Sequence, residues 1–296
     1  MEINSLRSEL DRIDTIPDKE WMESLDDRKQ KELSFHDQFR DSSQVETLSN
    51  EEKEQIYGNK KYYSMDEDYD KDLPYAQINY KLEALIYVNR WIENNVADKV
   101  FLDYCCGDGE KTILAAKSGA SLAIGVDISE QSVLNARKKA IEEGVEANTY
   151  FVQGDAEDTK LPSESIDRII CTGVLHHLDV SYAFPELRRV LAPEGKIMCL
   201  EALDYNPAIK WYRKLTPEMR TVWEMNHILS LKEIGFAKWF FDVKDIRYWH
   251  ISSILGPHLK LMIPFFRVLD RILTKIPFIQ LMAWIFTFEL HRKAGD

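Results

Sequence analysis

The stretch VFLDYCCGDGEKT, residues 100–112, constrains the fold of this chain more than any other. A short apolar run leads into Gly107 and Gly109 and then into a polar segment, which predicts a buried strand, a tight turn and a helix. A second apolar run ends at Asp127, twenty residues beyond Gly107. This spacing places a carboxylate beside the turn, where it can accept hydrogen bonds from both hydroxyls of a ribose. We therefore expect a unit that binds a nucleoside.

Two classes of cofactor compete for such a unit. Dinucleotide-binding turns carry Gly-x-Gly-x-x-Gly, whereas the frame that starts at Gly107 reaches Thr112 where the third glycine is needed. Asp103 precedes the turn, and a carboxylate there would repel a pyrophosphate but suit a cationic amino-acid group. Both observations weaken an interpretation of the chain as an NAD-dependent oxidoreductase.

Residues 102–109 read Leu-Asp-Tyr-Cys-Cys-Gly-Asp-Gly. This segment resembles the first motif of the class I S-adenosylmethionine (SAM)-dependent methyltransferases, which typically reads Leu-Asp-Leu-Gly-Cys-Gly-Thr-Gly. Cys105 departs from the family pattern, because it stands where the first glycine is usual. The resemblance implies SAM as the cofactor, and it implies these cofactor-binding residues: Asp103, Cys105, Gly107, Gly109, Asp127, Ile128, Asp155, Ala156, Thr172 and, from an N-terminal arm, Tyr63.

The resemblance also assigns roles to these residues. Asp103 and the glycine turn face the methionine part of SAM, and Ile128 lies beside the adenine. Asp127 binds the ribose; the alternative is that it only caps the helix expected at 130–143. Asp155 accepts from the adenine amino group and Ala156 offers a backbone N–H; the alternative for Asp155 is a simple turn residue.

Alternating strands and helices predict an α/β fold with a parallel sheet and right-handed crossovers. The resemblance makes it a Rossmann-like, doubly wound sheet of seven strands. Its last strand is antiparallel and lies between the fifth and the sixth. Strands are expected at 99–104, 121–127, 149–153, 166–172, 196–201, 241–248 and 282–291, and helices at 18–39, 74–95, 110–118, 130–143, from about 182, and at 251–276.

Four segments follow from this alternation. Residues 1–72 form an acidic helical arm, and residues 73–202 form the SAM-binding core. Residues 203–240 are a helical cap rich in aromatic side chains, suited to keeping water out of the site. Residues 241–296 contain strands six and seven with an amphipathic helix between them, an insertion that is longer than the simplest family pattern.

Histidines supply the candidate catalytic groups. His176 and His177 follow strand four, where the family places the cofactor methyl group and its acceptor, and His227 lies in the cap. A neutral imidazole there can take a proton from an attacking hydroxyl or amine. The alternative is that one histidine packs while the other merely lines the cofactor. The expected reaction is an in-line displacement at the sulfonium methyl, in which alignment does most of the work and no metal is required.

Charge and cysteine content exclude several classes. The net charge of −12 argues against nucleic acid as a partner. The four cysteines lack metal-type spacing and are expected to be reduced thiols in or near the core. A charged N-terminus and the lack of a long apolar run predict a cytoplasmic protein without a signal peptide or a spanning helix.

The C-terminal region is the exception to this acidity. From residue 251 onward the chain has six Lys/Arg and three Asp/Glu, and residues 251–276 form a basic amphipathic stretch. This stretch is either a lid over the cap or a contact with a membrane surface or a lipid-like substrate. We expect methyl transfer to an oxygen or nitrogen of a small, partly hydrophobic acceptor. The alternative is a SAM-binding regulatory or partner protein without catalysis, and the sequence leaves the oligomeric state open.

Overall fold

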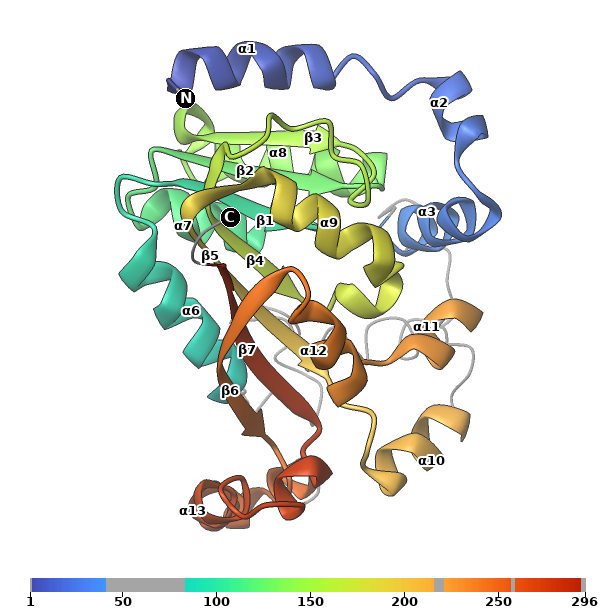
Figure 1. Ribbon diagram of the computed structural model, residues 1–296, viewed down its shortest axis with the longest axis vertical. Helices are drawn as coiled ribbons and strands as arrows, with labels where there is room; N and C mark the ends of the chain where they lie inside the picture. Colours follow the sequence, from blue (N-terminus) through green and yellow to red (C-terminus); the bar gives the residue numbers. More distant parts are fainter. Residues whose placement is uncertain (1, 41–82, 216–220, 257–258, 294–296) are drawn as a thin grey trace.

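A seven-stranded sheet forms the centre of the molecule (Figure 1). The computed structural model describes residues 2–40, 83–215, 221–256 and 259–293. The strands are β1 Val100–Tyr104, β2 Leu122–Asp127, β3 Thr149–Gln153, β4 Ile166–Thr172, β5 Leu191–Ala202, β6 Phe241–Trp249 and β7 Ile285–Arg292. Their order is β3-β2-β1-β4-β5-β7-β6. Strand β7 pairs antiparallel with both β5 and β6, while β1 to β5 pair in parallel, so the predicted fold class is confirmed.

Helices cover both faces of this sheet because side chains alternate along each strand. Leu102 and Tyr104 of β1 point into one core, which α1, α9 and α12 close. Phe101 of the same strand points into the opposite core, which α6 and α7 close. A smaller core lies between α7, α8 and Phe151 of β3. These helices are α1 Ile3–Ile13, α6 Glu83–Asn95, α7 Glu110–Lys117, α8 Glu130–Glu142, α9 Val180–Val190 and α12 Leu231–Ala237.

The remaining helices lie along one side and at one end of the molecule (Figure 1). They are α2 Lys19–Ser24 and α3 Asp27–Arg40 in the N-terminal arm, and α10 Pro207–Leu215 and α11 Val222–His227 in the cap. The α13 helix Ile263–Leu273 lies between β6 and β7. Short 3-10 helices occur at η1 Glu146–Asn148, η2 Leu175–His177, η4 Ser253–Leu255, η5 Lys260–Met262 and η6 Ile279–Met282.

Two predicted helices are wrong in length. The helix expected at 18–39 is broken at Leu25, whose backbone is extended, and the Asp26 side chain accepts from the Lys29 N–H at 2.9 Å to start a new helix. The stretch expected to be helical from 251 to 276 has its α-helix only at Ile263–Leu273, because Pro264 suits a first turn and not a helix interior. The part of the helix expected at 74–95 that lies before residue 83 is outside the described residues.

Strand ends differ less from expectation. Strand β7 begins at Ile285, three residues later than predicted, because η6 occupies the chain up to Met282. Helix α9 begins at Val180, since the Asp179 side chain accepts from the Ser181 N–H and caps it. Strand β5 already pairs with β4 at Leu191 before the turn that precedes its main run.

Residues 251–284, which lie between β6 and β7, are called the tip below. Ile285 at the start of β7 pairs with Ala202 at the end of β5 and with Trp249 at the end of β6. The tip therefore leaves the sheet at the edge where the parallel strands end, the same edge at which α/β folds bind ligands. Within the described part of the chain, no helix is long and apolar enough to span a bilayer.

A buried carboxylate fixes the tip to the end of β6. Asp270 of α13 is 5% exposed and accepts five hydrogen bonds. The donors are the backbone N–H groups of Ile251, Ser252 and Ser253 and both serine hydroxyls, at 2.5–3.2 Å. Because no cation is among these donors, the hydrogen bonds themselves must compensate the loss of water around the carboxylate.

Replacing Asp270 by Ala should leave several buried donors unsatisfied. We expect the free energy of unfolding to fall by about 2–4 kcal/mol in a urea titration followed by circular dichroism. Lys275→Ala, an exposed substitution on the same segment, is the control and should change stability by less than about 0.5 kcal/mol. Equal stability of the two variants would contradict a structural role for Asp270.

Candidate functional site

The turn after β1 has the backbone that its glycines predict. Gly107 and Gly109 both have positive φ, at 52° and 78°, and Gly109 is the N-cap of α7. A Cβ on Gly109 would lie 2.7 Å from Phe151 Cε1. Cys105 also has positive φ, at 61°. A non-glycine residue is strained in this region by about 1 kcal/mol, which gives a physical reason for the glycine usual at this position in the family.

Asp127 connects the second strand to this turn. Its Oδ2 accepts from the Gly107 N–H at 2.8 Å and its Oδ1 accepts from the Ser129 N–H at 3.0 Å. The cap of α8 is supplied by the Ser129 hydroxyl, which accepts from the Ser132 N–H. Asp127 is therefore not the helix cap that the sequence left open, and its carboxylate sits against the glycine turn.

Asp103 lies beneath the turn and is almost fully buried. Its Oδ2 accepts from the N–H and the hydroxyl of Thr112, at 3.1 and 2.9 Å. Burial raises the pKa of Asp103 to about 7 in spite of these hydrogen bonds and of the nearby Lys111 ammonium. Near neutral pH this carboxyl group can thus hold a proton or release it.

Asp155 follows β3 at the same edge of the sheet. Its Oδ1 accepts from the Glu157 N–H at 2.9 Å, as a turn residue would, while its Oδ2 pairs with the Lys29 ammonium at 2.6 Å. Ala156 is buried, and its carbonyl accepts from the Tyr104 hydroxyl. Ile128 is half-buried, and its carbonyl accepts from Gln153.

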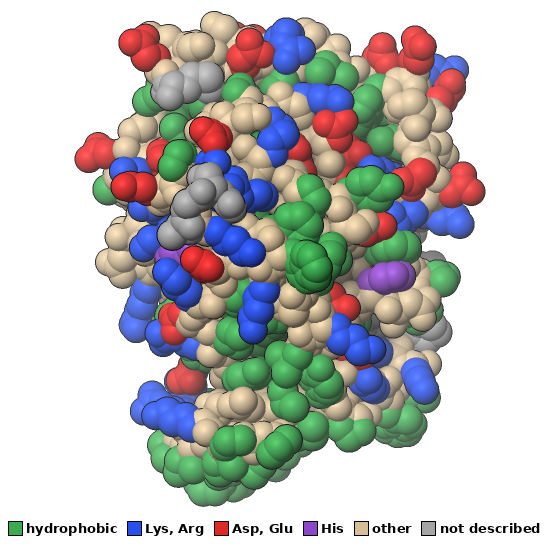
Figure 2. Space-filling model, in the orientation of Figure 1, with side chains coloured by type: hydrophobic (Ala, Val, Ile, Leu, Met, Phe, Trp, Pro, Cys, Tyr) green, Lys and Arg blue, Asp and Glu red, His purple; other side chains and the backbone are tan. Residues whose placement is uncertain are grey.

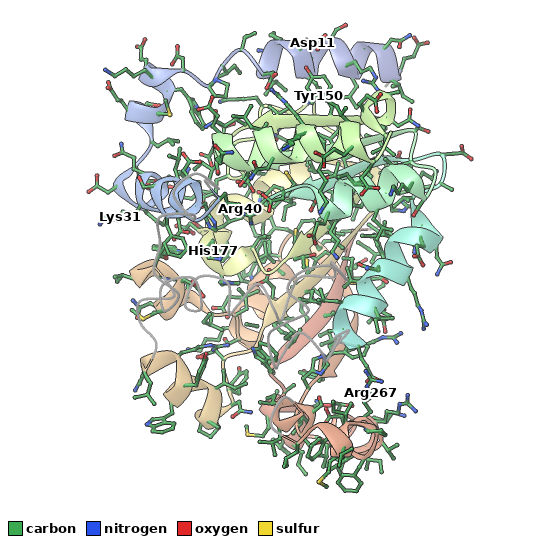
Figure 3. All side chains as sticks on the ribbon, turned by 180° about the vertical axis from the view of Figure 1, so that it is seen from behind. Asp11, Lys31, Arg40, Tyr150, His177 and Arg267 are labelled. Atoms are coloured by element: carbon green, nitrogen blue, oxygen red, sulfur yellow. The ribbon has the colours of Figure 1, made fainter. Side chains whose placement is uncertain are left out.

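The N-terminal helix α3 lies along this edge (Figure 3). Arg28 makes a bidentate pair with Glu157 at 2.7 and 2.8 Å and donates to the His177 carbonyl at 3.0 Å. The Ser129 hydroxyl donates to Asp37 at 2.5 Å. Because burial costs charged groups their hydration, such paired contacts fix α3 in one register against the strand tips.

Arg40, at the end of α3, lies directly on the glycine turn. A Cβ on Gly107 would be 2.7 Å from the Arg40 guanidinium, which also pairs with Asp108 at 2.7 Å. Its buried Nε has no hydrogen-bond partner among the described residues. In Figure 3 the labelled Arg40 reaches toward the strand tips, whereas Lys31 of the same helix points outward.

His176 is the more enclosed member of the predicted histidine pair. Its Nδ1 lies 2.7 Å from Glu201 Oε2, and Glu201, at the end of β5, is fully buried. The other Glu201 oxygen accepts from the N–H groups of Val174 and Leu175, both at 2.9 Å. Glu201 therefore fixes the ring through Nδ1, and Nε2 points away from it, 3.9 Å from Oε1 of Glu224 in α11. Thr172, at the tip of β4, has a buried hydroxyl without a partner among the described residues.

His177 faces the N-terminal arm. Its Nδ1 lies 3.1 Å from Glu32 of α3, and its ring centroid lies 5.4 Å from that of His36. Within the part of the chain that the structure describes, Glu32, His36 and His177 form the one group of three potential metal ligands, with ligand atoms within 4.8 Å of one another. Thr221 also donates to Glu32 at 2.5 Å, so hydrogen bonds hold the group together without an ion. That the reaction needs no metal stays a prediction.

His227, the third predicted histidine, is not brought to this cluster. His227 is exposed, and its ring stacks on Trp223 at 3.6 Å between centroids while its Nδ1 bonds the Trp223 carbonyl. Tyr63 lies outside the described residues.

Sequence reasoning missed the partners that come from distant segments. Lys29, Glu32 and Arg40 belong to an arm with no motif, and their charges look like an ordinary solvated helix face. Glu201 carried a usable signal, because an acidic residue closing a predicted buried strand needs a partner.

Comparison with known proteins identifies the domain to which this site belongs. Residues 102–199 match the family model described as a methyltransferase domain. This segment contains the glycine turn, Asp127, Asp155 and both adjacent histidines. The chain contains a class I SAM-dependent methyltransferase domain.

Several methyltransferases are relatives of this domain in sequence. The chain is 35% identical over 106 residues to a ubiquinone/menaquinone biosynthesis C-methyltransferase of Rickettsia akari, covering 34% of this chain and 43% of that protein. It is 35% identical over 124 residues to a demethylmenaquinone methyltransferase of Lactobacillus johnsonii, covering 39% of this chain and 51% of that protein. The chain thus spans about half the length of the curated relatives it matches.

Solved structures share the fold over a larger part of this chain. The geranyl diphosphate C-methyltransferase of Streptomyces coelicolor aligns with a TM-score of 0.56 at 15% identity, covering 78% of this chain and 88% of that one. The YcgJ protein of Bacillus subtilis aligns with a TM-score of 0.51 at 21% identity, covering 71% of this chain and 99% of that one. At these identities the likeness establishes the fold.

The raised pKa of Asp103 predicts a pH-dependent effect of Asp103→Asn. The unfolded chain loses this proton near pH 4 and the folded chain near pH 7, so ionisation lowers the stability of the wild type as the pH rises between these values. The amide is always neutral and avoids this loss. We expect the stability of the variant relative to the wild type to rise by about 2–4 kcal/mol between pH 4 and pH 8, measured by urea unfolding. A stability difference that is constant with pH would contradict the assignment.

Proposed function

We propose that this protein transfers a methyl group from SAM to a small, partly hydrophobic acceptor. The observation that carries the proposal is the arrangement of Asp103, Asp127 and Asp155 at successive strand tips around one glycine turn, beside a buried His176–Glu201 pair. Negative side chains at these positions suit a ligand that joins a ribose and an adenine to a positively charged sulfur.

The proposed cofactor contacts follow the strand tips. Asp127 would accept hydrogen bonds from the ribose hydroxyls. Its carboxylate oxygens have lone pairs left for this after accepting from the backbone N–H groups of Gly107 and Ser129. Asp155 would accept a hydrogen bond from the adenine amino group. For this, the Lys29 ammonium has to leave the Asp155 carboxylate or share it with the adenine. Asp103 lies beneath the turn, where the positive charge of a bound sulfonium would favour the ionised form of its carboxyl group.

Methyl transfer itself needs alignment more than chemical assistance. SAM supplies an activated methyl group, and the protein has to hold the acceptor in line with the carbon–sulfur bond, which is worth on the order of 7–11 kcal/mol. We propose His176 as the group that removes the acceptor proton through Nε2, because Glu201 fixes its Nδ1. His177 would instead hold the arm through Glu32.

The acceptor is proposed from the cap and from the relatives. Helix α11 packs against η2, and Trp223 of α11 lies under the Arg28 guanidinium at 4.9 Å, so an aromatic side chain stands beside the histidines. The Rickettsia akari relative is named as a C-methyltransferase of ubiquinone and menaquinone biosynthesis, so the proposal covers carbon as well as the oxygen and nitrogen expected from the sequence. The alternative is a protein that binds SAM without catalysing a reaction, and the test must distinguish it from a methyltransferase.

The test measures SAM binding by calorimetry and S-adenosylhomocysteine formation with apolar phenols, amines and hydroxylated ring compounds. We expect binding and product with at least one acceptor, and a loss in kcat of about 10²–10⁴-fold for His176→Ala. His227→Ala is the matched histidine control and should retain turnover, because its exposed ring stacks on Trp223. Binding without any product would favour the non-catalytic alternative, and unchanged turnover in His176→Ala would remove the base role.

Arg40 generates a separate binding prediction. Its guanidinium lies on the turn where the methionine part of SAM would lie, so we expect it to bind the methionine carboxylate. Arg40→Ala should weaken S-adenosylhomocysteine binding by about 10–100-fold but leave 5′-methylthioadenosine, which lacks that carboxylate, unaffected.

Calorimetry with both ligands checks the Arg40 prediction, with Lys31→Ala as a control from the outward face of α3. Tighter binding of both ligands to Arg40→Ala would show that the side chain obstructs the site, which contradicts the carboxylate role.

A further inference from the structure

The tip exposes an unusual number of large apolar side chains. Leu261 is 99% and Phe278 is 83% exposed. Others in the same segment are also largely exposed: Leu255, Leu259, Met262, Phe265, Val268, Ile272, Ile276 and Ile279. Single exposed apolar residues are ordinary, but a continuous group of this kind marks an interaction surface. Figure 2 shows hydrophobic side chains gathered at the end of the molecule where Figure 1 draws α13.

Helix α13 presents its apolar side outward. A surface helix of a water-soluble domain normally buries its apolar face and exposes a polar one. Here the buried positions are Phe266 and the hydrogen-bonded Asp270, whereas Phe265, Val268 and Ile272 face outward. The five hydrogen bonds to Asp270 fix this orientation, so the exposure is built into the fold.

The tip also differs from the rest of the chain in charge. Residues 251–284 contain four Lys/Arg and one Asp, a balance of +3, whereas the remaining residues sum to −15. The single acid is the buried Asp270, so the exposed acidic groups of the protein lie elsewhere. Arg267 and Arg271 stand 4.0 and 3.8 Å from Glu83 of α6, at the border between the apolar group and the core.

Helix α10 adds aromatic side chains at the same end of the molecule (Figure 1). Trp211 and Tyr212 are exposed, and Lys210 and Arg213 of the same helix pair with Asp204. Trp and Tyr are the residues enriched where a protein meets the polar boundary of a bilayer.

We propose that the tip docks on the surface of an anionic lipid bilayer, with its apolar side chains entering the boundary between headgroups and acyl chains and its cations among the headgroups. Apolar contact and attraction to anionic lipid add in such binding, and each is present here. A second copy of the chain is a poorer occupant, because a two-fold contact would bring two tips of charge +3 together.

Docking in this way would turn the site toward the lipid. The tip leaves the sheet at the edge where β5 ends, which is also the edge of Asp103, Asp127 and Glu201. An acceptor dissolved in the bilayer would then reach the site without crossing water; this last consequence rests on the proposed methyl transfer, whereas the docking does not.

Co-sedimentation of the full chain with vesicles tests the proposal. Vesicles of phosphatidylcholine mixed with phosphatidylglycerol should bind the protein, and vesicles of phosphatidylcholine alone should bind it about tenfold or more weakly. The double variant Leu261→Glu/Phe278→Glu should lose binding by about tenfold or more, because two of the most exposed apolar side chains become anionic.

Ile141→Glu and Trp239→Glu are matched controls, since these apolar side chains are 65% and 79% exposed but lie outside the tip. They should bind vesicles as the wild type does, and all variants should keep the wild-type melting temperature.

Absence of vesicle binding, equal binding to both vesicle types, or unchanged binding of the tip variant overturns the proposal. A dimer in light scattering that the tip variant dissociates, without vesicle binding, assigns the surface to a second copy. SAM binding and turnover of the tip variant with a water-soluble acceptor report separately on the proposed function.

Discussion

Compensation of negative charge at the strand tips is the constraint on which the rest of this structure depends. Parallel strands bring Asp103, Asp127 and Asp155 to one edge of the sheet, where each carboxylate loses water. The chain compensates them by different means: backbone N–H groups for Asp127, an ammonium from α3 for Asp155, and a raised pKa for Asp103. A cationic sulfur nucleoside would enter a region already organised to receive positive charge.

The N-terminal arm follows from the same constraint. Arg28, Lys29 and Arg40 place three cations of one helix against acids of the core. Glu32 extends the contact to His177 and Thr221, so the arm, η2 and the cap are joined through one carboxylate. Any movement of α3 away from the strand tips has to exchange these charged contacts for others, which couples the position of the arm to what occupies the strand tips.

Local signals in the sequence predicted the strands and the glycine turn, and the family resemblance supplied the order of the sheet. Contacts between side chains of distant segments could be predicted from neither. Strands β3 and β4 begin and end where predicted, because apolar runs bounded by turn residues are unambiguous. The sequence showed only that Cys105 stands where the motif has a glycine. The structure shows why glycine is usual there, because the backbone at this position is left-handed. Arg40 and Lys29 could not be placed, since nothing in an acidic, motif-free arm says which core residue each will meet. The break at Leu25 and the short α13 show that apolar periodicity continues through positions where capping and proline end a helix.

The connection of the tip to the sheet has a consequence for how such a protein can diversify. Residues 251–284 join two antiparallel neighbours, β6 and β7, at the margin of the sheet, and their main polar anchor is one carboxylate of their own helix. The glycine turn, the carboxylates at the strand tips and the His176–His177 pair all lie outside this segment. The proposed lipid contact and the proposed methyl transfer therefore depend on separate stretches of chain, so the tip can change in sequence or length without altering the residues at the strand tips.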